Sequence, residues 1–370
     1  MPYREEDISI YWIDSDAELA RAVDSWSSVV ALDTEFIRTN TFYPIPGLYQ
    51  VASDTDVFLL DPLAIEDWEP LKSYLMNPDT CKIMHACLED LELIFAHLRI
   101  VPSNVFDTQL AHAYVSQDYS LSYARLIERY SGVLLEKEHT RSDWLQRPLS
   151  DDQLRYAVDD VVHLAAVGEL LRQRLNELQR WSWFQEDMQQ RAAYEEPRPQ
   201  AYYRQVKRAW QLNEVQLSAL QRLCEWRENA ARRLDVPRNR VIWDEHLFTF
   251  AQSHSLTEST LAKFLPAAII RRFGAQLIEV HQRSSESDDV AMLLDRPLSP
   301  SQGARLKALR DLGREAANSL GLAPELLARK KDVEACLRQF NATGELSGIY
   351  LGWRREVVGD GFLQVLEVAG

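Results

Sequence analysis

The acidic side chains best placed for chemistry lie at the ends of predicted elements in the first half of the chain: Asp33, Glu35, Asp90 and Asp160. Asp33 and Glu35 follow the apolar run 29–32, which has the composition of a buried strand. On a strand, positions 33 and 35 point to the same face, so we expect their carboxylates to lie side by side. Like charges a few ångströms apart raise each other's pKa. Such a cluster therefore requires a compensating cation.

A tyrosine, Tyr156, precedes Asp160 by four residues, the spacing that puts two side chains on one helix face. If this face meets the end of the first strand, four carboxylates converge in one pocket. Hard oxygen ligands suit Mg²⁺ or Mn²⁺, and no set of cysteines and histidines favours zinc. Two such ions, about 3.5–4 Å apart, are the usual apparatus of phosphodiester hydrolysis. We expect Tyr156 to orient the attacking water or to help deprotonate it.

Two other aspartates compete for places in this cluster. Asp107 comes directly before an apolar helical run, a position typical of a helix N-cap, so Asp90 is the better candidate. Asp159 lacks the four-residue spacing from Tyr156 that Asp160 has.

Candidate substrate contacts lie outside the carboxylates. Phe36 and Tyr43 are candidates for stacking on terminal bases, which is worth about 1–3 kcal/mol per base, although core packing is an equal alternative for Phe36. Arg141 is a candidate phosphate contact, with a surface loop as the alternative.

The segments that must position these residues predict an α/β domain with a mixed sheet. Short runs rich in β-formers are separated by turn signals and predict a strand meander over 28–36, 47–53 and 56–61. Helical patterns then alternate with the apolar run 81–85, which favours helices flanking the sheet. These helices are expected over 66–76, 88–98, 107–116 and 121–130.

A longer helix is predicted from Ser150 to about residue 178. Ser150 and Gln153 have the spacing of a capping box, and an apolar stripe follows them. The prolines in 195–200 indicate a linker, after which the pattern is helical with almost no strand signal. Similar caps predict helices beginning near residues 213 and 299.

The charge of the chain is unevenly distributed. The formal net charge is −15, with 17 basic and 35 acidic residues in 1–200 but 24 basic and 21 acidic residues in 201–370. This distribution fits a catalytic domain that needs carboxylates, followed by domains that contact phosphates, although unrelated domains would give the same counts. No signal peptide, membrane span or disulfide framework is evident, so we expect a cytoplasmic protein.

Three motifs carry a resemblance to a known superfamily. Asp33-x-Glu35, His85…Glu89-Asp90 and Tyr156-x-x-x-Asp160 resemble, in this order, the exonuclease motifs of the tyrosine-containing branch of the DEDD superfamily. The flanking stretches LDTEFIRTNTFYP, HACLEDLELI and RSDWLQRPLSDDQLRYAVDDVVHL are similar to the ribonuclease D family. This likeness covers roughly residues 28–175.

The resemblance continues in the second half and implies a domain order. Residues 217–251 are similar to the HRDC domain, a helical module named for helicases and ribonuclease D. The implied fold is an α/β ribonuclease H-like exonuclease domain followed by two small all-α bundles. The expected boundaries are a 3′-5′ exonuclease domain over 1–195, a linker over 196–208, a first HRDC domain over 209–288 and a diverged second copy over 297–370.

The resemblance also implies roles for the site residues. Asp33, Glu35 and Asp160 would hold the first metal ion, Asp33 would bridge to the second, and Asp90 would steady the second. Tyr156 would take the place of the histidine in the sister branch.

The implied activity is 3′-5′ exonucleolytic hydrolysis of RNA, including tRNA precursors and other structured RNAs with single-stranded 3′ ends, releasing nucleoside 5′-monophosphates. The implied cofactors are two Mg²⁺ or Mn²⁺ ions, with no small-molecule cofactor and no membrane partner. A DNA-directed exonuclease is one alternative, because the metal chemistry is indifferent to the 2′-hydroxyl. A non-catalytic RNA-binding scaffold is the other alternative.

Overall fold

The computed structural model describes residues 8–135, 142–285, 293–346 and 348–367. These residues form two compact units, each of which is described separately. The first unit contains the described residues of Met1–Ile37, Pro46–Tyr194 and Leu298–Gly370, and the second contains those of Arg38–Ile45 and Glu195–Pro297. No described helix is long and apolar enough to cross a membrane.

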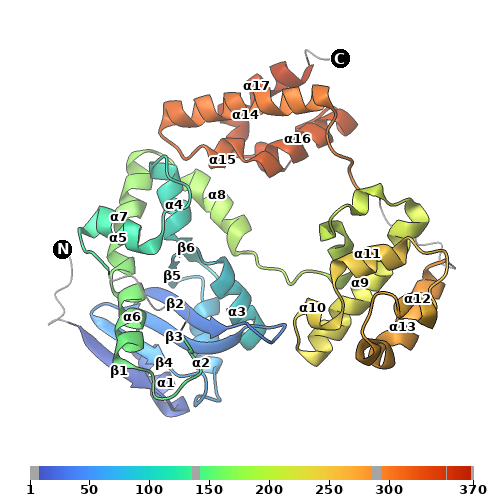
Figure 1. Cartoon of the computed structure of the whole chain (residues 1–370). Helices are drawn as coiled ribbons and strands as arrows, with labels where there is room; N and C mark the ends of the chain where they lie inside the picture. The colour runs from blue at the N-terminus through green and yellow to red at the C-terminus, as the bar shows by residue number, and fades with distance from the viewer. Residues whose placement is uncertain (1–7, 136–141, 286–292, 347, 368–370) are drawn as a thin grey trace. The chain divides into compact units, whose positions relative to one another are not determined.

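A mixed six-stranded sheet forms the centre of the first unit (Figure 1). Its strands are β1 (Ser9–Ile13), β2 (Val29–Ile37), β3 (Ile45–Ser53), β4 (Asp56–Leu60), β5 (Cys81–Met84) and β6 (Val105–Asp107), in the spatial order β1-β4-β3-β2-β5-β6. The pairs β1–β4, β2–β5 and β5–β6 are parallel, whereas β3 and β4 are antiparallel. The mixed sheet is confirmed, and the three strands predicted as a meander are the neighbours β2, β3 and β4.

Helices flank this sheet, as the sequence predicted. They are α1 (Asp16–Ser25), α2 (Glu69–Met76), α3 (Leu88–Leu98), α4 (Thr108–Val115), α5 (Tyr123–Ser131), α6 (Asp151–Val162), α7 (Leu164–Glu177) and α8 (Trp181–Ala192). Strand β1 and helices α1 and α8 were not predicted from the sequence. The capping box of Ser150 and Gln153 is present at the start of α6. The prediction of one helix up to residue 178 is wrong, because the helix is interrupted at His163. Both halves contact β2, but α6 also packs on β4, whereas α7 packs on α4, α5 and β5.

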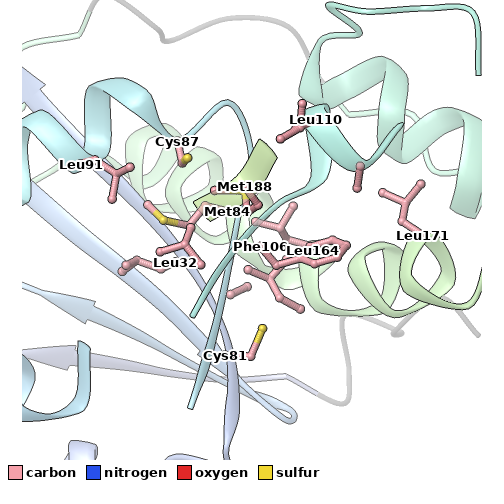
Figure 2. Close-up of a cluster of buried hydrophobic side chains, with 14 of the residues drawn as sticks. Leu32, Cys81, Met84, Cys87, Leu91, Phe106, Leu110, Leu164, Leu171 and Met188 are labelled. Carbon is pink, nitrogen blue, oxygen red and sulfur yellow. The ribbon is translucent and has the colours of Figure 1, made fainter. Parts of the chain in front are cut away.

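The core beside β5 holds α3, α7 and α8 against the sheet (Figure 2). Leu32, Met84 and Phe106 come from three neighbouring strands and are buried. Leu91 of α3 and Leu164 of α7 complete this cluster. Since full burial of one such side chain contributes about 1.5–3 kcal/mol, this layer fixes the strand ends that carry the acidic residues.

The C-terminal helices also belong to the first unit. They are α14 (Pro300–Leu320), α15 (Glu325–Ala328), α16 (Lys330–Thr343), the 3₁₀ helix η4 (Gly348–Tyr350) and α17 (Trp353–Glu367). At their contact with α8, Arg354 donates two hydrogen bonds to Asp187, of 2.7 and 2.5 Å. Trp183 and Trp353 stack beside this pair, with ring centroids 4.7 Å apart.

The second unit is helical around a core of its own. It contains η2 (Pro199–Gln205), η3 (Ala209–Gln211), α9 (Glu214–Leu234), α10 (Arg238–Val241), α11 (Asp244–Ala251), α12 (Glu258–Leu261) and α13 (Ala267–Ser285). The connection between β2 and β3 packs here as well, because the backbone amides of Phe42 and Tyr43 both donate to Asp235. The helical character predicted for the chain beyond the linker is confirmed in both units.

Candidate metal centre

Strand β2 and helix α6 bring three of the predicted carboxylates together. Asp33 and Glu35 lie on one face of β2, as the strand period requires. Asp160 comes from the last turn of α6, which packs against β2. One oxygen from each of the three carboxylates lies within 4.8 Å of the others. Among the described residues, this is the one group of three or more such side chains with the spacing of metal ligands.

The fourth carboxylate, Asp90, is buried in the first turn of α3. It accepts a hydrogen bond of 2.5 Å from the hydroxyl of Thr34. Thr34 is buried and lies between Asp33 and Glu35 in the sequence. Asp90 lies outside the compact group of three, but its charge contributes to raising the pKa values of Asp33 and Glu35. All four predicted acidic residues therefore share one electrostatic environment.

This environment opposes ionisation of the four carboxyl groups. Burial, followed by the charges of Asp160 and Asp90, raises the pKa of Glu35 to about 9. Burial is also the main cause that raises the pKa of Asp90 and of Asp160 to about 7 each. The pKa of Asp33 is raised well above its usual range, first by burial and then by Asp90, Asp160 and Glu35.

The donor set fits a divalent metal ion. None of the four carboxylates forms an ion pair with a lysine or arginine within the described parts of the chain. Oxygen ligands without sulfur or imidazole suit hard cations such as Mg²⁺ and Mn²⁺. A bound cation would stabilise the ionised carboxylates that burial and mutual repulsion otherwise disfavour.

Tyr156 lies one helical turn before Asp160, and its hydroxyl hydrogen-bonds that carboxyl group. Burial, followed by the charges of Asp160, Glu35 and Asp33, raises the pKa of Tyr156 above the ordinary range. The hydroxyl is therefore protonated near neutral pH and acts as a hydrogen-bond donor at the edge of the carboxylate group.

Trp144 and Gly47 support this tyrosine, and neither was expected from the sequence. The rings of Trp144 and Tyr156 pack with centroids 6.0 Å apart. A Cβ atom on Gly47 would lie 2.5 Å from Cβ of Trp144 and 3.2 Å from the backbone oxygen of Glu35. Only glycine allows β2, β3 and the segment of Trp144 to approach this closely.

The two competing aspartates have other partners. Asp107 caps α4 by accepting from the amides of Gln109 and Leu110 at 2.9 and 3.3 Å, which confirms the predicted N-cap. It also forms an ion pair with Arg191, in which nitrogen and oxygen are 2.7 Å apart. Asp159 precedes Asp160, and it is Asp160 that contributes to the group of three carboxylates.

The predicted substrate contacts do not belong to one unit of the described structure. Phe36 is half-buried and packs against the core of the first unit. Tyr43 belongs to the second unit, where its ring packs edge-on against Phe42 at 4.9 Å and its hydroxyl donates to Glu196 at 3.2 Å. Arg141 lies outside the described residues. Phe36, Tyr43 and Arg141 stay predictions as substrate contacts.

Thr34 was missed because its hydrogen bond joins β2 to α3, and Asp90 lies 56 residues further along the chain. Tyr123 was missed as well: its hydroxyl donates to the backbone oxygen of Asp159 at 2.6 Å, and the charges of Asp160 and Asp33 contribute to raising its pKa. No local pattern marks that contact.

Comparison with known proteins relates both halves of the chain to described families. Residues 10–176 match a family model described as 3′-5′ exonuclease, and residues 216–280 match the HRDC domain. Ribonuclease D of Pseudomonas paraeruginosa is 40% identical over 370 residues, covering 97% of this chain and 98% of the relative. Ribonuclease D of Escherichia coli K12 is 31% identical, and 96% of each chain is covered.

Solved structures show the same likeness. The crystal structure of Escherichia coli RNase D matches with a TM-score of 0.90 at 30% identity, covering 98% of this chain and all of the other. The catalytic core of RRP6 from Trypanosoma brucei, at 23% identity and a TM-score of 0.58, covers 78% of this chain and 83% of its own. That second match shows a shared fold.

Proposed function

The chain belongs to the ribonuclease D family and is a 3′-5′ exoribonuclease, and we propose that it trims the 3′ ends of tRNA precursors and other structured RNAs. The Escherichia coli relative is described as an exoribonuclease involved in structured RNA processing, which supports this choice of substrate. The expected products are nucleoside 5′-monophosphates. The cytoplasmic location and the four domain boundaries expected from the sequence stay predictions.

The observation that carries the catalytic part of the proposal is the convergence of Asp33, Glu35 and Asp160 within 4.8 Å, with Asp90 beside them. We propose that these four carboxylates hold two divalent ions, Mg²⁺ or Mn²⁺. When bound, such ions supply an activated water and neutralise charge on the attacking and leaving oxygens.

The residues of the chain then have distinct tasks. Asp33, Glu35 and Asp160 would hold the first ion, Asp33 would also contact the second, and Asp90 would steady the second. Tyr156 keeps its proton, since its pKa lies above the ordinary range, and its hydroxyl orients the attacking water. Thr34 fixes the carboxylate of Asp90 through the hydrogen bond of 2.5 Å.

The direct test is a time course with 5′-labelled nucleic acids. A 3′-extended tRNA transcript and a DNA strand of the same sequence are incubated with Mg²⁺, Mn²⁺ or EDTA. We expect the labelled RNA to shorten stepwise from its 3′ end with either metal and to give no product in EDTA. Shortening of DNA alone would contradict the RNA substrate, and shortening in EDTA would contradict the metal mechanism.

A further inference from the structure

The second unit contains a cavity of about 850 Å³, a volume within the range of about 300–1,000 Å³ typical of ligand sites. Its walls come from the connection between β2 and β3, from η2 and the residues after it, and from α10 and α11. All of these residues belong to the second unit. In a chain with net charge −15, the lining carries five basic side chains and two acidic ones.

The two arginines in the floor of this cavity are stacked on aromatic rings and paired with carboxylates. Arg227 stacks over Tyr202 at 4.4 Å and donates to Asp244 at 2.5 Å. Arg238 stacks over Phe42 at 4.8 Å, and its side chain pairs with the buried Glu228. Two of the five basic residues, Arg227 and Arg238, therefore stabilise the wall of the cavity.

The rim carries the cations that remain. Arg38, Lys207 and Arg208 line the cavity and are exposed. Neither Lys207 nor Arg208 forms an ion pair with any residue in the described ranges. The guanidinium of Arg208 lies 5.2 Å from the ring centroid of Phe248, which holds it at the cavity. The exposed Glu245 lines the cavity as well, so the rim carries three cations against one carboxylate outside the floor, and its net positive charge attracts an anion.

Trp243 adds an aromatic surface to the same rim. It lines the cavity, it is 56% exposed, and it makes no ring-stacking contact with another described aromatic residue. It also precedes α11 directly, so its backbone is fixed by the start of that helix. An exposed indole beside the exposed cations Lys207 and Arg208 is the combination that binds unpaired nucleotides, because bases stack on aromatic faces and phosphates pair with cations.

We propose that this cavity binds an unpaired nucleotide of the substrate RNA, with its base on Trp243 and its phosphate at Lys207 and Arg208. The proposal rests on the RNA substrate of the proposed function and adds a binding site outside the metal centre. A nucleotide within an A-form duplex does not expose a base face, so the site selects single-stranded segments. A free nucleotide carries the same base and phosphate groups, and the competition experiment below distinguishes it from RNA.

The test measures binding of fluorescently labelled RNA to the full chain in EDTA, so that no turnover is needed. The ligands are a single-stranded oligonucleotide and a blunt duplex, and the variants are Trp243→Ala and Lys207→Gln. We expect Trp243→Ala to weaken single-strand binding about tenfold and Trp243→Phe to restore most of the loss. Lys207→Gln is expected to reduce the slope of log affinity against log salt by about 0.7, the value for one phosphate contact on a single strand.

Two matched variants serve as controls. Trp210→Ala removes another exposed tryptophan of the same unit, and Lys263→Gln removes an exposed lysine, and neither residue lines the cavity. Both are expected to bind RNA like the wild type. Equal losses in Trp210→Ala and Trp243→Ala, or wild-type binding in both Trp243→Ala and Lys207→Gln, would overturn the site.

Adenosine 5′-monophosphate serves as a competitor in the same assay. We expect that millimolar adenosine 5′-monophosphate does not displace the oligonucleotide, because neighbouring nucleotides of the RNA also contribute to binding. Displacement at micromolar nucleotide would overturn the RNA assignment in favour of a free nucleotide. Because the assay uses no metal, its result is independent of the cleavage time course that tests the proposed function.

Discussion

The hydroxyl group of Thr34 donates a hydrogen bond of 2.5 Å to the carboxylate of Asp90, a residue 56 positions further along the chain. This bond ties α3 to the strand that carries Asp33 and Glu35. It also lowers the pKa of Asp90, whereas burial raises it. Thr34 is therefore a positioning residue for the carboxylate that is expected to steady the second metal ion.

Replacing Thr34 by valine tests this relationship. Valine keeps the shape of the side chain but removes the donor, so we expect Thr34→Val to weaken metal affinity about 10–100-fold, as loss of a residue that orients a ligand typically does. The measurement is the concentration of Mn²⁺ that gives half-maximal RNA hydrolysis. Thr34→Ser keeps the hydroxyl and is the control. Equal metal dependence in Thr34→Val and the wild type would rule out the positioning role.

Replacing Tyr156 by phenylalanine tests the hydroxyl at the edge of the metal centre. We expect Tyr156→Phe to slow single-turnover hydrolysis at least ~10-fold, because the water loses an orienting donor, while metal affinity is unchanged. Rapid-quench kinetics on 5′-labelled RNA measures the chemical step. A wild-type single-turnover rate would remove Tyr156 from the mechanism.

The contact between Gly47 and Trp144 leads to a prediction about packing. A Cβ atom at position 47 would lie 2.5 Å from that of Trp144, so Gly47→Ala requires the backbone to move. Such overpacking typically costs about 1–3 kcal/mol in the free energy of unfolding. We also expect slower turnover, since Trp144 packs on Tyr156. Chemical denaturation and kinetics check both effects, and an unchanged midpoint would show that this approach is not tight.

The raised pKa values of the carboxylates predict how stability depends on pH without metal. In the unfolded chain Glu35 titrates near 4.5, but in the folded protein its pKa is about 9, and those of Asp90 and Asp160 are about 7. Because the folded state favours the protonated groups, their contribution to stability is fully present below pH 4 and is lost as pH rises towards 9.

Metal should reverse this loss, since it binds the ionised carboxylates. We expect the melting temperature in EDTA to fall between pH 5.5 and 9, and the increase caused by Mg²⁺ to be larger at pH 9. At a concentration 100-fold above its Kd, one bound ion adds about 2.7 kcal/mol. Thermal melts over this pH range provide the measurement. A smaller increase at pH 9 than at pH 5.5 would contradict the assignment of these groups as ligands.

The parts of the fold that the sequence predicted are those with strong local patterns. Strands β2 to β5 are short runs of β-forming or apolar residues, helices α2 to α5 have helical patterns, and the capping box at Ser150 marks the start of α6. Strand β6 is too short, at three residues, to show a period. Helix α8 was missed because its only buried residues are Phe184 and Met188, which give little apolar stripe.

The residues of the metal centre likewise divide into those that a local sequence pattern relates and those that only the fold brings together. Asp33, Glu35 and the pair Tyr156 and Asp160 are related by strand and helix periods that the sequence displays. The contacts of Thr34 with Asp90 and of Gly47 with Trp144 join distant segments, and no local pattern encodes which segments meet. The break at His163 coincides with a change of packing partners, from β4 for α6 to α4 and α5 for α7, which the local pattern does not show either.

The central claim is that the carboxylate group on β2 and α6 cleaves RNA through bound metal, and Asp160→Asn tests it most directly. This change keeps the shape of the side chain but removes a ligand charge. We predict that a 5′-labelled, 3′-extended tRNA transcript is shortened from its 3′ end by the wild type in Mg²⁺. The variant should bind the same RNA with unchanged affinity and leave it intact. Shortening by Asp160→Asn at the wild-type rate would contradict the claim.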